Sequence, residues 1–312
     1  MLHGRLAPSP TGVLHLGNAR SFLLAWWDLR ARGGQVHLRM EDLDGPRVKA
    51  GADQAAMEDL QWLGLDWDTG PVYQKPRIDR YREVLEKLAQ QGLAYPCICS
   101  RKDVLAAASA PHAGEEGPVY PGTCRGRFPT GADATRQSGT APSWRFAVPE
   151  GSEVGFEDRF RGACRIQVDR DLGDFVIWKR DGEPAYQLAV VVDDADQGMT
   201  EILRGDDLLS SAARQILLYQ HLQWPVPRFA HVPLVIGTDG RRLAKRHGDT
   251  TLRRFRELGR SPIEVLQWLA FSCGHPEWNR LQCPADGIEG FDLAKVPDRP
   301  WVWQGELLDP WP

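Results

Sequence analysis

Hydrophobic residues change their spacing twice near the start of the chain. Residues 2–7 form a short and mostly apolar segment, and residues 35–40 alternate polar with apolar side chains, so both segments predict strands. Between them, apolar residues recur at intervals of three and four, which is the spacing of one helix face. The apolar positions of that predicted helix are Leu16, Ala19, Phe22, Leu23, Trp26 and Leu29. A strand, a helix and a second strand predict a parallel βαβ unit.

The rest of the chain adds further helices and a second group of strands. We predict helices at residues 53–63, 77–91, 210–222, 251–258 and 262–273, and strands at 143–149, 174–180 and 184–196. Residues 106–139 are rich in Gly, Pro, Ala and Thr without periodicity, which indicates a loop-rich insertion. The expected fold is α/β, with a Rossmann-type parallel sheet in residues 1–245, an insertion at about 95–140 and a helical domain in 246–312.

Composition and charge indicate a globular protein and do not identify its ligand. The 312 residues include 42% hydrophobic and 26% charged residues, as in an ordinary globular protein. Apolar runs fall well short of the roughly 20 residues of a membrane span, and a signal peptide is not recognisable, so we expect a cytoplasmic protein. The formal net charge of -4 gives no overall reason to expect nucleic acid. Residues 241–260 nevertheless contain eight Lys or Arg against two acids, which fits either an RNA-contacting rim or a charged helix face.

The turn between the first strand and the first helix has the features of a phosphate site. Carboxyl ends of parallel strands meet at one edge of a sheet, so Ala7 and Glu41 should line one crevice. The first helical turn carries His15, Gly17 and Asn18 and should leave backbone N–H groups unpaired for an anion. A Walker loop is excluded because its lysine and hydroxyl are missing, and the dinucleotide fingerprint G-x-G-x-x-G is also missing from this stretch.

Three of the six cysteines are grouped in the predicted insertion. Cys97, Cys99 and Cys124 would supply three thiolates, and tetrahedral zinc requires a fourth ligand. From the residues alone, His112 is an ordinary candidate and Tyr120 an unusual one, because a phenol must lose a proton near pH 10. A loop-rich insertion has little core of its own, so a metal there is expected to be structural.

Two separated motifs resemble the signatures of class I aminoacyl-tRNA synthetases. The stretch GRLAPSPTGVLHLGN at residues 4–18 is similar to the HIGH signature, and RLAKR at 242–246 is similar to KMSKS, with Ala244 where the family usually has serine. The resemblance implies catalytic roles for His15, Asn18 and Lys245. It also implies ATP binding by His15, Gly17, Asn18, Arg242, Leu243 and Lys245, with Mg²⁺ on the phosphates.

Together with MEDLD at 40–44 and residues 184–215, these motifs look like the catalytic core of glutamyl-tRNA synthetases. The resemblance implies a glutamate pocket in which Arg5, with Ala7 and Ser9, holds the side-chain carboxylate. It further implies that Glu41 takes the ammonium group and that Tyr186 and Arg204 complete the pocket. For either arginine taken singly, a surface ion pair is the alternative.

The chain is most similar in organisation to the family of glutamyl-Q tRNA(Asp) synthetases, because it ends soon after the second signature, where glutamyl-tRNA synthetases continue into an anticodon-binding region. This resemblance implies tRNA-independent, ATP-dependent activation of L-glutamate to glutamyl-adenylate, and its transfer to queuosine at the first anticodon position of tRNA(Asp). The implied partner is the anticodon loop of tRNA(Asp), contacted in part by a stem-contact-like helical domain, and we expect a monomer.

The same family shows C-x-C followed by Y-x-x-x-C, which implies one structural zinc ion held by Cys97, Cys99, Tyr120 and Cys124. Two other functions are alternatives. One is a truncated or discriminating glutamyl-tRNA synthetase that charges a tRNA 3′ end. The other is a non-catalytic sensor of glutamate or a nucleotide, favoured by the departures at Asn18 and Ala244.

Overall fold

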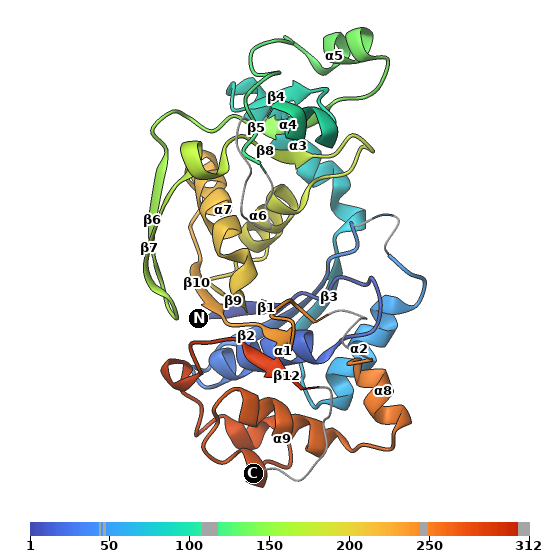
Figure 1. Ribbon diagram of the computed structural model, residues 1–312, viewed down its shortest axis with the longest axis vertical. Helices are drawn as coiled ribbons and strands as arrows, with labels where there is room; N and C mark the ends of the chain where they lie inside the picture. Colours follow the sequence, from blue (N-terminus) through green and yellow to red (C-terminus); the bar gives the residue numbers. More distant parts are fainter. Residues whose placement is uncertain (44, 46–47, 108–117, 244–248, 305–312) are drawn as a thin grey trace.

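A twisted parallel sheet forms the centre of the molecule (Figure 1). The computed structural model describes residues 1–43, 45, 48–107, 118–243 and 249–304. Strands β1 (His3–Leu6), β2 (Gln35–Met40) and β3 (Thr69–Tyr73) pair in parallel in that order, and β9 (Glu201–Gly205) pairs in parallel with β10 (Arg228–Val232). The amide of Thr200 donates to the carbonyl of His3 at 2.9 Å, which joins β9 to the free side of β1.

The predicted βαβ unit is confirmed. Helix α1 (Leu16–Arg30) connects β1 to β2, and α2 (Ala52–Trp62) leads to β3. Helix α1 packs closely on β1 at Gly4, where an added Cβ would lie 2.6 Å from the Leu29 side chain. Glycine at that position therefore sets the helix–sheet distance, because a larger side chain would push α1 off the strand.

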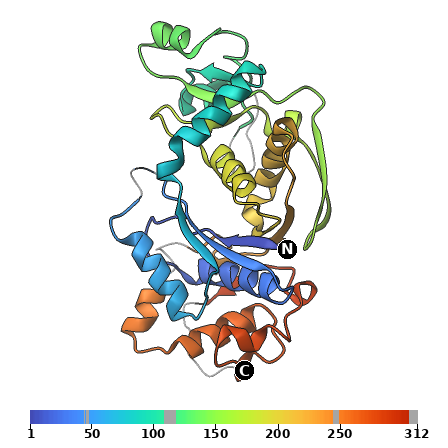
Figure 2. The same cartoon turned by 180° about the vertical axis from the view of Figure 1, so that it is seen from behind.

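Helices cover both faces of the sheet, as Figures 1 and 2 show from opposite sides. On one face, α1 shares a hydrophobic core with Leu203 of β9 and Ala230 of β10. On the other, α3 (Ile78–Gln90), α6 (Tyr186–Asp196) and α7 (Leu209–Leu222) pack with Ile202 and Phe229 from the same strands. The alternation of these strand residues between two cores is the period-two pattern of a strand buried on both faces.

The prediction of a strand at residues 184–196 is wrong, because this segment forms helix α6. Its run of Leu, Ala and Val has no alternation, and a short, uniformly apolar run does not distinguish a buried strand from a buried helix. Residues Leu188–Asp194 of α6 are all buried, so tertiary packing outweighs the strand preference of three consecutive valines. The central strand of this half is instead β9, which follows α6 and is buried along its whole length.

The predicted insertion at about 95–140 lies beyond α3, contains helices of its own and is bordered by strands of an antiparallel sheet. An antiparallel sheet is formed by β4 (Ala94–Cys97), β5 (Ser143–Phe146) and β8 (Phe175–Trp178), of which β5 and β8 follow the insertion in sequence. The hairpin of β6 (Glu153–Asp158) and β7 (Gly162–Gln167) also follows it and contacts β10 and α7. The segment predicted as loop contains α5 (Gly131–Ser138), and α4 (Arg101–Ala107) precedes it. A small core that includes Tyr95, Phe128 and Ala134 supports this region.

The C-terminal segment packs on α1, on the side away from α6 and α7 (Figure 1). The predicted helices are confirmed as α8 (Leu252–Glu257) and α9 (Pro262–Ser272), and β12 (Trp301–Trp303) pairs in parallel with β11 (Val235–Gly237). The buried Arg20 of α1 donates to the carbonyls of Pro233 and Ser272, which links the helix to both. Because residues from both sides of the predicted boundary at 245 share one core, that boundary stays a prediction.

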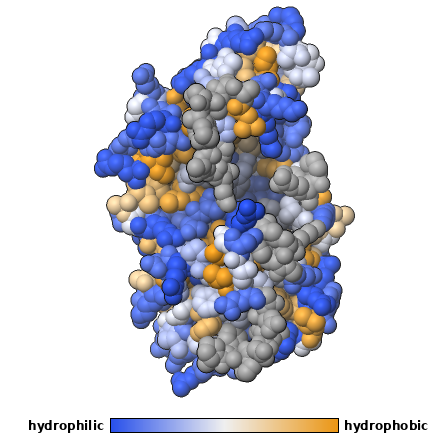
Figure 3. Space-filling view, viewed as in Figure 1, coloured by the Kyte–Doolittle hydropathy of each residue, from blue (hydrophilic) through white to orange (hydrophobic). Residues whose placement is uncertain are grey.

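Several short helical turns connect these elements: Lys75–Arg77, Val168–Leu172, Asp206–Leu208, Trp278–Arg280, Pro284–Gly287 and Leu293–Lys295. On the face drawn in Figure 3, hydrophilic residues predominate and hydrophobic ones are scattered. Within the described parts of the chain, every helix is too short or too polar to cross a membrane.

Candidate active site

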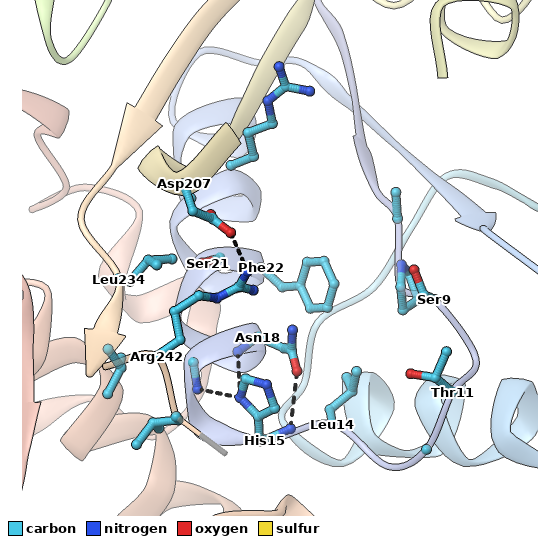
Figure 4. A pocket seen from close by; sticks show the side chains of 18 of the residues that line it. Ser9, Thr11, Leu14, His15, Asn18, Ser21, Phe22, Asp207, Leu234 and Arg242 are labelled. Carbon is cyan, nitrogen blue, oxygen red and sulfur yellow. Dashed lines mark hydrogen bonds and ion pairs between the residues drawn. The ribbon is translucent and has the colours of Figure 1, made fainter. Parts of the chain in front are cut away.

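One cavity of about 1030 Å³ opens at the carboxyl ends of β1, β2 and β9, beside the start of α1. Every described residue predicted for ATP or glutamate lines it: Arg5, Ala7, Ser9, His15, Gly17, Asn18, Glu41, Tyr186, Arg204, Arg242 and Leu243. Figure 4 shows Ser9 and Thr11 across the cavity from Arg242, with His15, Asn18 and Phe22 between them. The remaining predicted residue, Lys245, lies outside the described residues, whereas Leu243 and Asp249 on either side of it line the cavity.

The expectation of unpaired N–H groups at the start of α1 is wrong. The ring of His15 turns back over the helix end, and its Nδ1 accepts the amides of Gly17 at 3.1 Å and Asn18 at 3.4 Å. Asn18 Oδ1 in turn accepts the amide of His15 at 3.4 Å, and the amide of Leu16 donates to the carbonyl of Thr250. The signature histidine is thus the N-cap of its own helix, in a reciprocal capping arrangement.

This cap determines which proton His15 can offer to a ligand. A ring nitrogen that accepts two N–H groups carries no proton, so the neutral ring carries its proton on Nε2. Burial and, secondarily, the charge of Arg242 lower the pKa of His15 to about 4. At neutral pH His15 is therefore an uncharged hydrogen-bond donor to the cavity. Glycine at position 17 leaves room for the His15 ring, because an added Cβ would lie 3.1 Å from it.

The described residues at the start of the second signature and those just after it lie beside the first signature. His15 pairs with Thr251 in an isolated antiparallel bridge, and the amide of Leu252 donates to the carbonyl of Leu14 at 2.9 Å. Arg242, which precedes the undescribed residues, forms an ion pair with Asp207 at 2.5 Å (Figure 4). Both sides of the second signature are therefore attached to the cavity that contains His15.

The opposite end of the cavity is built on buried ion pairs. Arg5 Nε donates to Asp194 Oδ1 at 3.0 Å, and the fully buried Arg39 contacts the same oxygen at 2.7 Å. Arg39 also donates to Glu41 at 3.0 Å, although burial still raises the pKa of Glu41. Asp194 of α6 therefore holds both Arg39, which lies behind the cavity lining, and Arg5, which reaches the cavity with a counter-ion already in place.

Arg204 has a different environment. It is 6% exposed, and none of the described carboxylates forms an ion pair with it. Its Nε donates to His231 Nε2 at 3.0 Å, while its terminal nitrogens make contacts of 3.4 Å with Tyr186 and Leu208. Burial lowers the pKa of Arg204. A buried guanidinium in a cavity wall without a carboxylate partner is suited to an anionic ligand. Neither Arg204 nor Arg5 is a surface ion pair, since both are buried.

Sequence reasoning missed the residues that hold these groups in place. Asp207 lies two residues beyond the end of β9, where the repeated acids of RGDD could have indicated a site residue. Asp194 lies in the segment for which the sequence predicts a strand, and His231 and Asp158 come from segments without a recognisable motif. Their roles depend on contacts across more than 25 residues of sequence, which local patterns do not carry.

Several arginines of the basic segment at residues 241–260 form ion pairs with acids, so less unpaired positive charge remains than the sequence suggests. Arg242 pairs with Asp207, Arg256 with Asp59, and Arg260 with Glu264. Asp59 also accepts the amide of Leu14, so Arg256 supports the loop before His15. Several of these arginines therefore serve the fold, and a role for this segment in RNA contact stays a prediction.

The cysteine cluster brings potential metal ligands close together. The sulfur atoms of Cys97, Cys99 and Cys124 lie within 4.8 Å of one another, and the Tyr120 hydroxyl lies 3.4 Å from the sulfurs of both Cys97 and Cys99. Four donors at such separations fit zinc, whose bonds to sulfur are about 2.3 Å long. Burial raises the pKa of Tyr120, so a dication would have to reverse that shift before the phenolate could coordinate. The other candidate, His112, lies outside the described residues.

The sequence matches known tRNA synthetases along nearly its whole length. Residues 1–310 match the family described as tRNA synthetases class I (E and Q), catalytic domain. The chain is 48% identical to a glutamyl-Q tRNA(Asp) synthetase of Symbiobacterium thermophilum, across 96% of this chain and 95% of that protein. It is 41% identical to one of Nitratidesulfovibrio vulgaris across 99% and 98%. It is also 40% identical to the glutamate–tRNA ligase of Aquifex aeolicus, but covers 64% of that protein.

The fold is similar to that of a solved glutamate tRNA ligase. The crystal structure of this enzyme from Elizabethkingia meningosepticum, in complex with its amino acid, has a TM-score of 0.81 and 27% identity. The similarity covers 98% of this chain and 68% of that one. This confirms the expected class I catalytic fold with its parallel sheet.

Proposed function

Since the chain belongs to the family of class I tRNA synthetases (E and Q), and within it to the glutamyl-Q tRNA(Asp) synthetases, we propose that it activates L-glutamate with ATP in the absence of RNA and transfers the glutamyl group to queuosine in the anticodon of tRNA(Asp). The observation that carries the proposal is a single cavity with two ends. Arg5 and Arg204 line one part of it, and the capped signature histidine, with Arg242 near it, lines another. An acidic amino acid and a nucleotide can therefore be held side by side.

At the amino-acid end, Arg5 and Arg204 supply the cations that glutamate requires. In the proposed complex, Arg5 with Ala7 and Ser9 holds the side-chain carboxylate, and Arg204 with Tyr186 completes the pocket. Glu41 would accept the ammonium group; the cation would offset the burial that raises the pKa of Glu41. Charge-assisted hydrogen bonds of this kind are strong because the groups are already removed from water.

At the nucleotide end, the chemistry is an in-line displacement at phosphorus. A carboxylate oxygen of glutamate attacks the α-phosphorus of ATP, the bond to the bridging oxygen breaks, and pyrophosphate leaves. The attacking carboxylate is already a nucleophile, so the step requires orientation and charge stabilisation rather than a general base. Neutral His15 donates from Nε2, Asn18 fixes the cap, and Arg242 and Lys245 offset phosphate charge; Mg²⁺ bound with ATP would neutralise the leaving group.

Pyrophosphate exchange tests the activation step. Purified protein, labelled pyrophosphate, ATP and glutamate should give glutamate-dependent label in ATP when RNA is left out. Lys245→Ala should abolish most of this exchange while the KM for glutamate stays within about threefold, because the lysine would contact phosphate and not the amino acid. No exchange in the wild type would contradict the proposed activation.

Transfer to the modified base needs its own test. The names of the relatives at 41–48% identity favour queuosine as acceptor, and the match to a glutamate–tRNA ligase keeps the tRNA 3′ end as the competing acceptor. Labelled glutamate should be transferred to tRNA(Asp) containing queuosine and not to the same RNA containing guanosine at that position. Equal labelling of both RNAs would contradict queuosine as the acceptor and favour charging of the tRNA 3′ end. Because ATP and tRNA are the proposed substrates, we also propose a cytoplasmic location for this activity.

We also propose a structural zinc ion at Cys97, Cys99, Tyr120 and Cys124. Arg145 supports the arrangement, because its Nε donates to the Cys97 sulfur at 3.3 Å and its guanidinium lies 3.8 Å from the centre of the Tyr120 ring. One equivalent of zinc by elemental analysis in the wild type, and much less in Cys124→Ser, would support the site. Equal zinc content in Cys124→Ser and wild type would contradict it.

A further inference from the structure

Three buried side chains from separate elements form a line that ends at the cavity. Asp158 of β6 contacts His231 of β10, with 2.6 Å between Oδ2 and Nδ1, and His231 contacts Arg204 of β9, with 3.0 Å between Nε2 and Nε. Their exposed fractions are 1%, 0% and 6%. Only Arg204 lines the cavity, so Asp158 and His231 lie behind it, away from any substrate.

The chemistry of the three groups fixes the direction of each hydrogen bond. A guanidinium has no acceptor, so His231 Nε2 must accept from Arg204 and cannot carry a proton. Nδ1 then carries the proton of the neutral ring and donates it to Asp158 Oδ2. The other carboxylate oxygen, Oδ1, accepts the backbone amides of Phe160, Arg161 and His231 at 2.9–3.1 Å. Asp158 is thereby held in one orientation.

The electrostatics agree with this assignment. Burial lowers the pKa of His231, which keeps the ring neutral. Burial alone would raise the pKa of Asp158, but hydrogen bonds from His231 and backbone amides hold it below its ordinary value. The line therefore consists of an anion, a neutral ring and a cation. Arg204 has a counter-charge, but an imidazole separates the two.

This indirect counter-charge distinguishes Arg204 from Arg5. Arg5 contacts its carboxylate, Asp194, directly through Nε. In Arg204 the Nε is occupied by His231, and the two terminal nitrogens keep only the 3.4 Å contacts with Tyr186 and Leu208. The guanidinium is oriented from behind while the edge that can bind a carboxylate in bidentate fashion stays available.

We propose that Asp158, acting through the neutral Nδ1–H tautomer of His231, is a positioning residue that orients Arg204 to bind a carboxylate of the glutamate substrate. This inference rests on the proposed glutamate activation. It assigns a role in substrate binding to the β6–β7 hairpin, which contributes no residue to the cavity lining.

The substitution Asp158→Asn reverses the polarity of the line and preserves its shape. The Asn oxygen would keep the three backbone amides, so its NH₂ group would face Nδ1 and force the ring proton onto Nε2, against the N–H of Arg204. We expect the KM for glutamate in pyrophosphate exchange to rise about 10- to 100-fold, with kcat and the KM for ATP within about threefold. An unchanged KM for glutamate would overturn the proposal.

Asp28→Asn is the matched control. Asp28 is also a buried carboxylate, and it pairs at 2.7 Å with Arg159, the residue next to Asp158. It touches neither His231 nor the cavity, so the KM for glutamate should stay within about twofold of wild type. A rise as large as that of Asp158→Asn would show that the hairpin acts only through stability, and would overturn the positioning role.

The tautomer can be measured in the wild type, which avoids any folding defect. Nitrogen-15 NMR of the histidine rings, with the His231 signals assigned by their loss in His231→Gln, should show Nδ1 protonated and Nε2 unprotonated at neutral pH. Protonated Nε2 would overturn the proposal. Lack of glutamate-dependent exchange in the wild type would instead reject the proposed function. Normal exchange in the wild type, together with an unchanged KM for glutamate in Asp158→Asn, would reject only the positioning role of Asp158.

Discussion

The two ends of the cavity, the proposed amino-acid end with Arg5 and Arg204 and the proposed nucleotide or phosphate end with His15, are stabilised in different ways. At the phosphate end, the cap contacts of His15 with Gly17 and Asn18 span two or three residues of sequence. At the amino-acid end, Arg5 depends on Asp194 and Arg204 depends on His231, which are 189 and 27 residues away in sequence. The helix cap at the phosphate end is a local motif, and contacts of Leu14 and Leu16 with distant residues attach it to the rest of the site. The amino-acid end exists only after distant strands and α6 have assembled.

The largest expected effect is at the amino-acid end. Arg204→Met keeps most of the side-chain volume and removes the buried guanidinium and its hydrogen bonds to a substrate carboxylate. Losing one partner of a buried charge-assisted pair costs about 4 kcal/mol, so kcat/KM for glutamate should fall about 1000-fold. Steady-state exchange kinetics measure this loss, with the KM for ATP as internal control. A fall of less than tenfold would contradict the assignment of Arg204 to the glutamate pocket.

A smaller loss is expected at the phosphate end, where two variants separate the two roles of His15. Asparagine is a good N-cap, so His15→Asn should keep the helix cap and remove the Nε2–H donor, while His15→Ala removes both. Both should lower kcat for exchange about 100-fold. Denaturant unfolding should show a further loss of about 1 kcal/mol in stability for His15→Ala only. Equal stabilities of the two variants would argue against the cap.

Gly17→Ala tests whether the position of the His15 ring also depends on the space that glycine leaves beside it. The added Cβ would meet the His15 ring at 3.1 Å, so the ring must shift by a few tenths of an ångström. We expect kcat for exchange to fall about tenfold without a loss of stability, since alanine favours helix. Gly155→Ala in β6, where the nearest atom would lie 4.0 Å away, is the control for a harmless added methyl group. Full activity of Gly17→Ala would show that the ring has room to move.

The smallest effect is a dependence of stability on pH at the phosphate end. Burial lowers the pKa of His15 to about 4 from an unfolded value of 6.5, so the unfolded state binds more protons between these values. Stability from this group is complete above pH 6.5 and declines as the pH falls toward 4. The free energy of unfolding of the wild type should drop by about 1 kcal/mol more than that of His15→Asn between pH 7 and 5.5. Parallel pH profiles would contradict a buried, neutral ring.

The sequence predicted more of the site than of the fold around it. The predicted βαβ unit matches β1, α1 and β2, and each described ATP- or glutamate-site residue from the resemblance lines the cavity. The prediction failed at α6, where an apolar run without alternation was assigned to a strand. It failed again at the start of α1, where the amides expected to be free are capped by His15. Both failures concern what a segment contacts, which residue spacing does not record.

The sequence by itself determined the local elements and the identities of the groups proposed to bind ATP, glutamate and zinc. Periodicity and turn chemistry act over a few residues, so the strand–turn–helix around His15 and the grouped cysteines were already visible in it. Only the tertiary structure decided the states of those groups. Burial makes His15 a neutral donor and gives Arg5 a direct counter-ion, and it places a neutral ring between Arg204 and Asp158. The physical reason is that hydrogen bonds and charges gain their strength from exclusion of water, which requires distant segments to pack together.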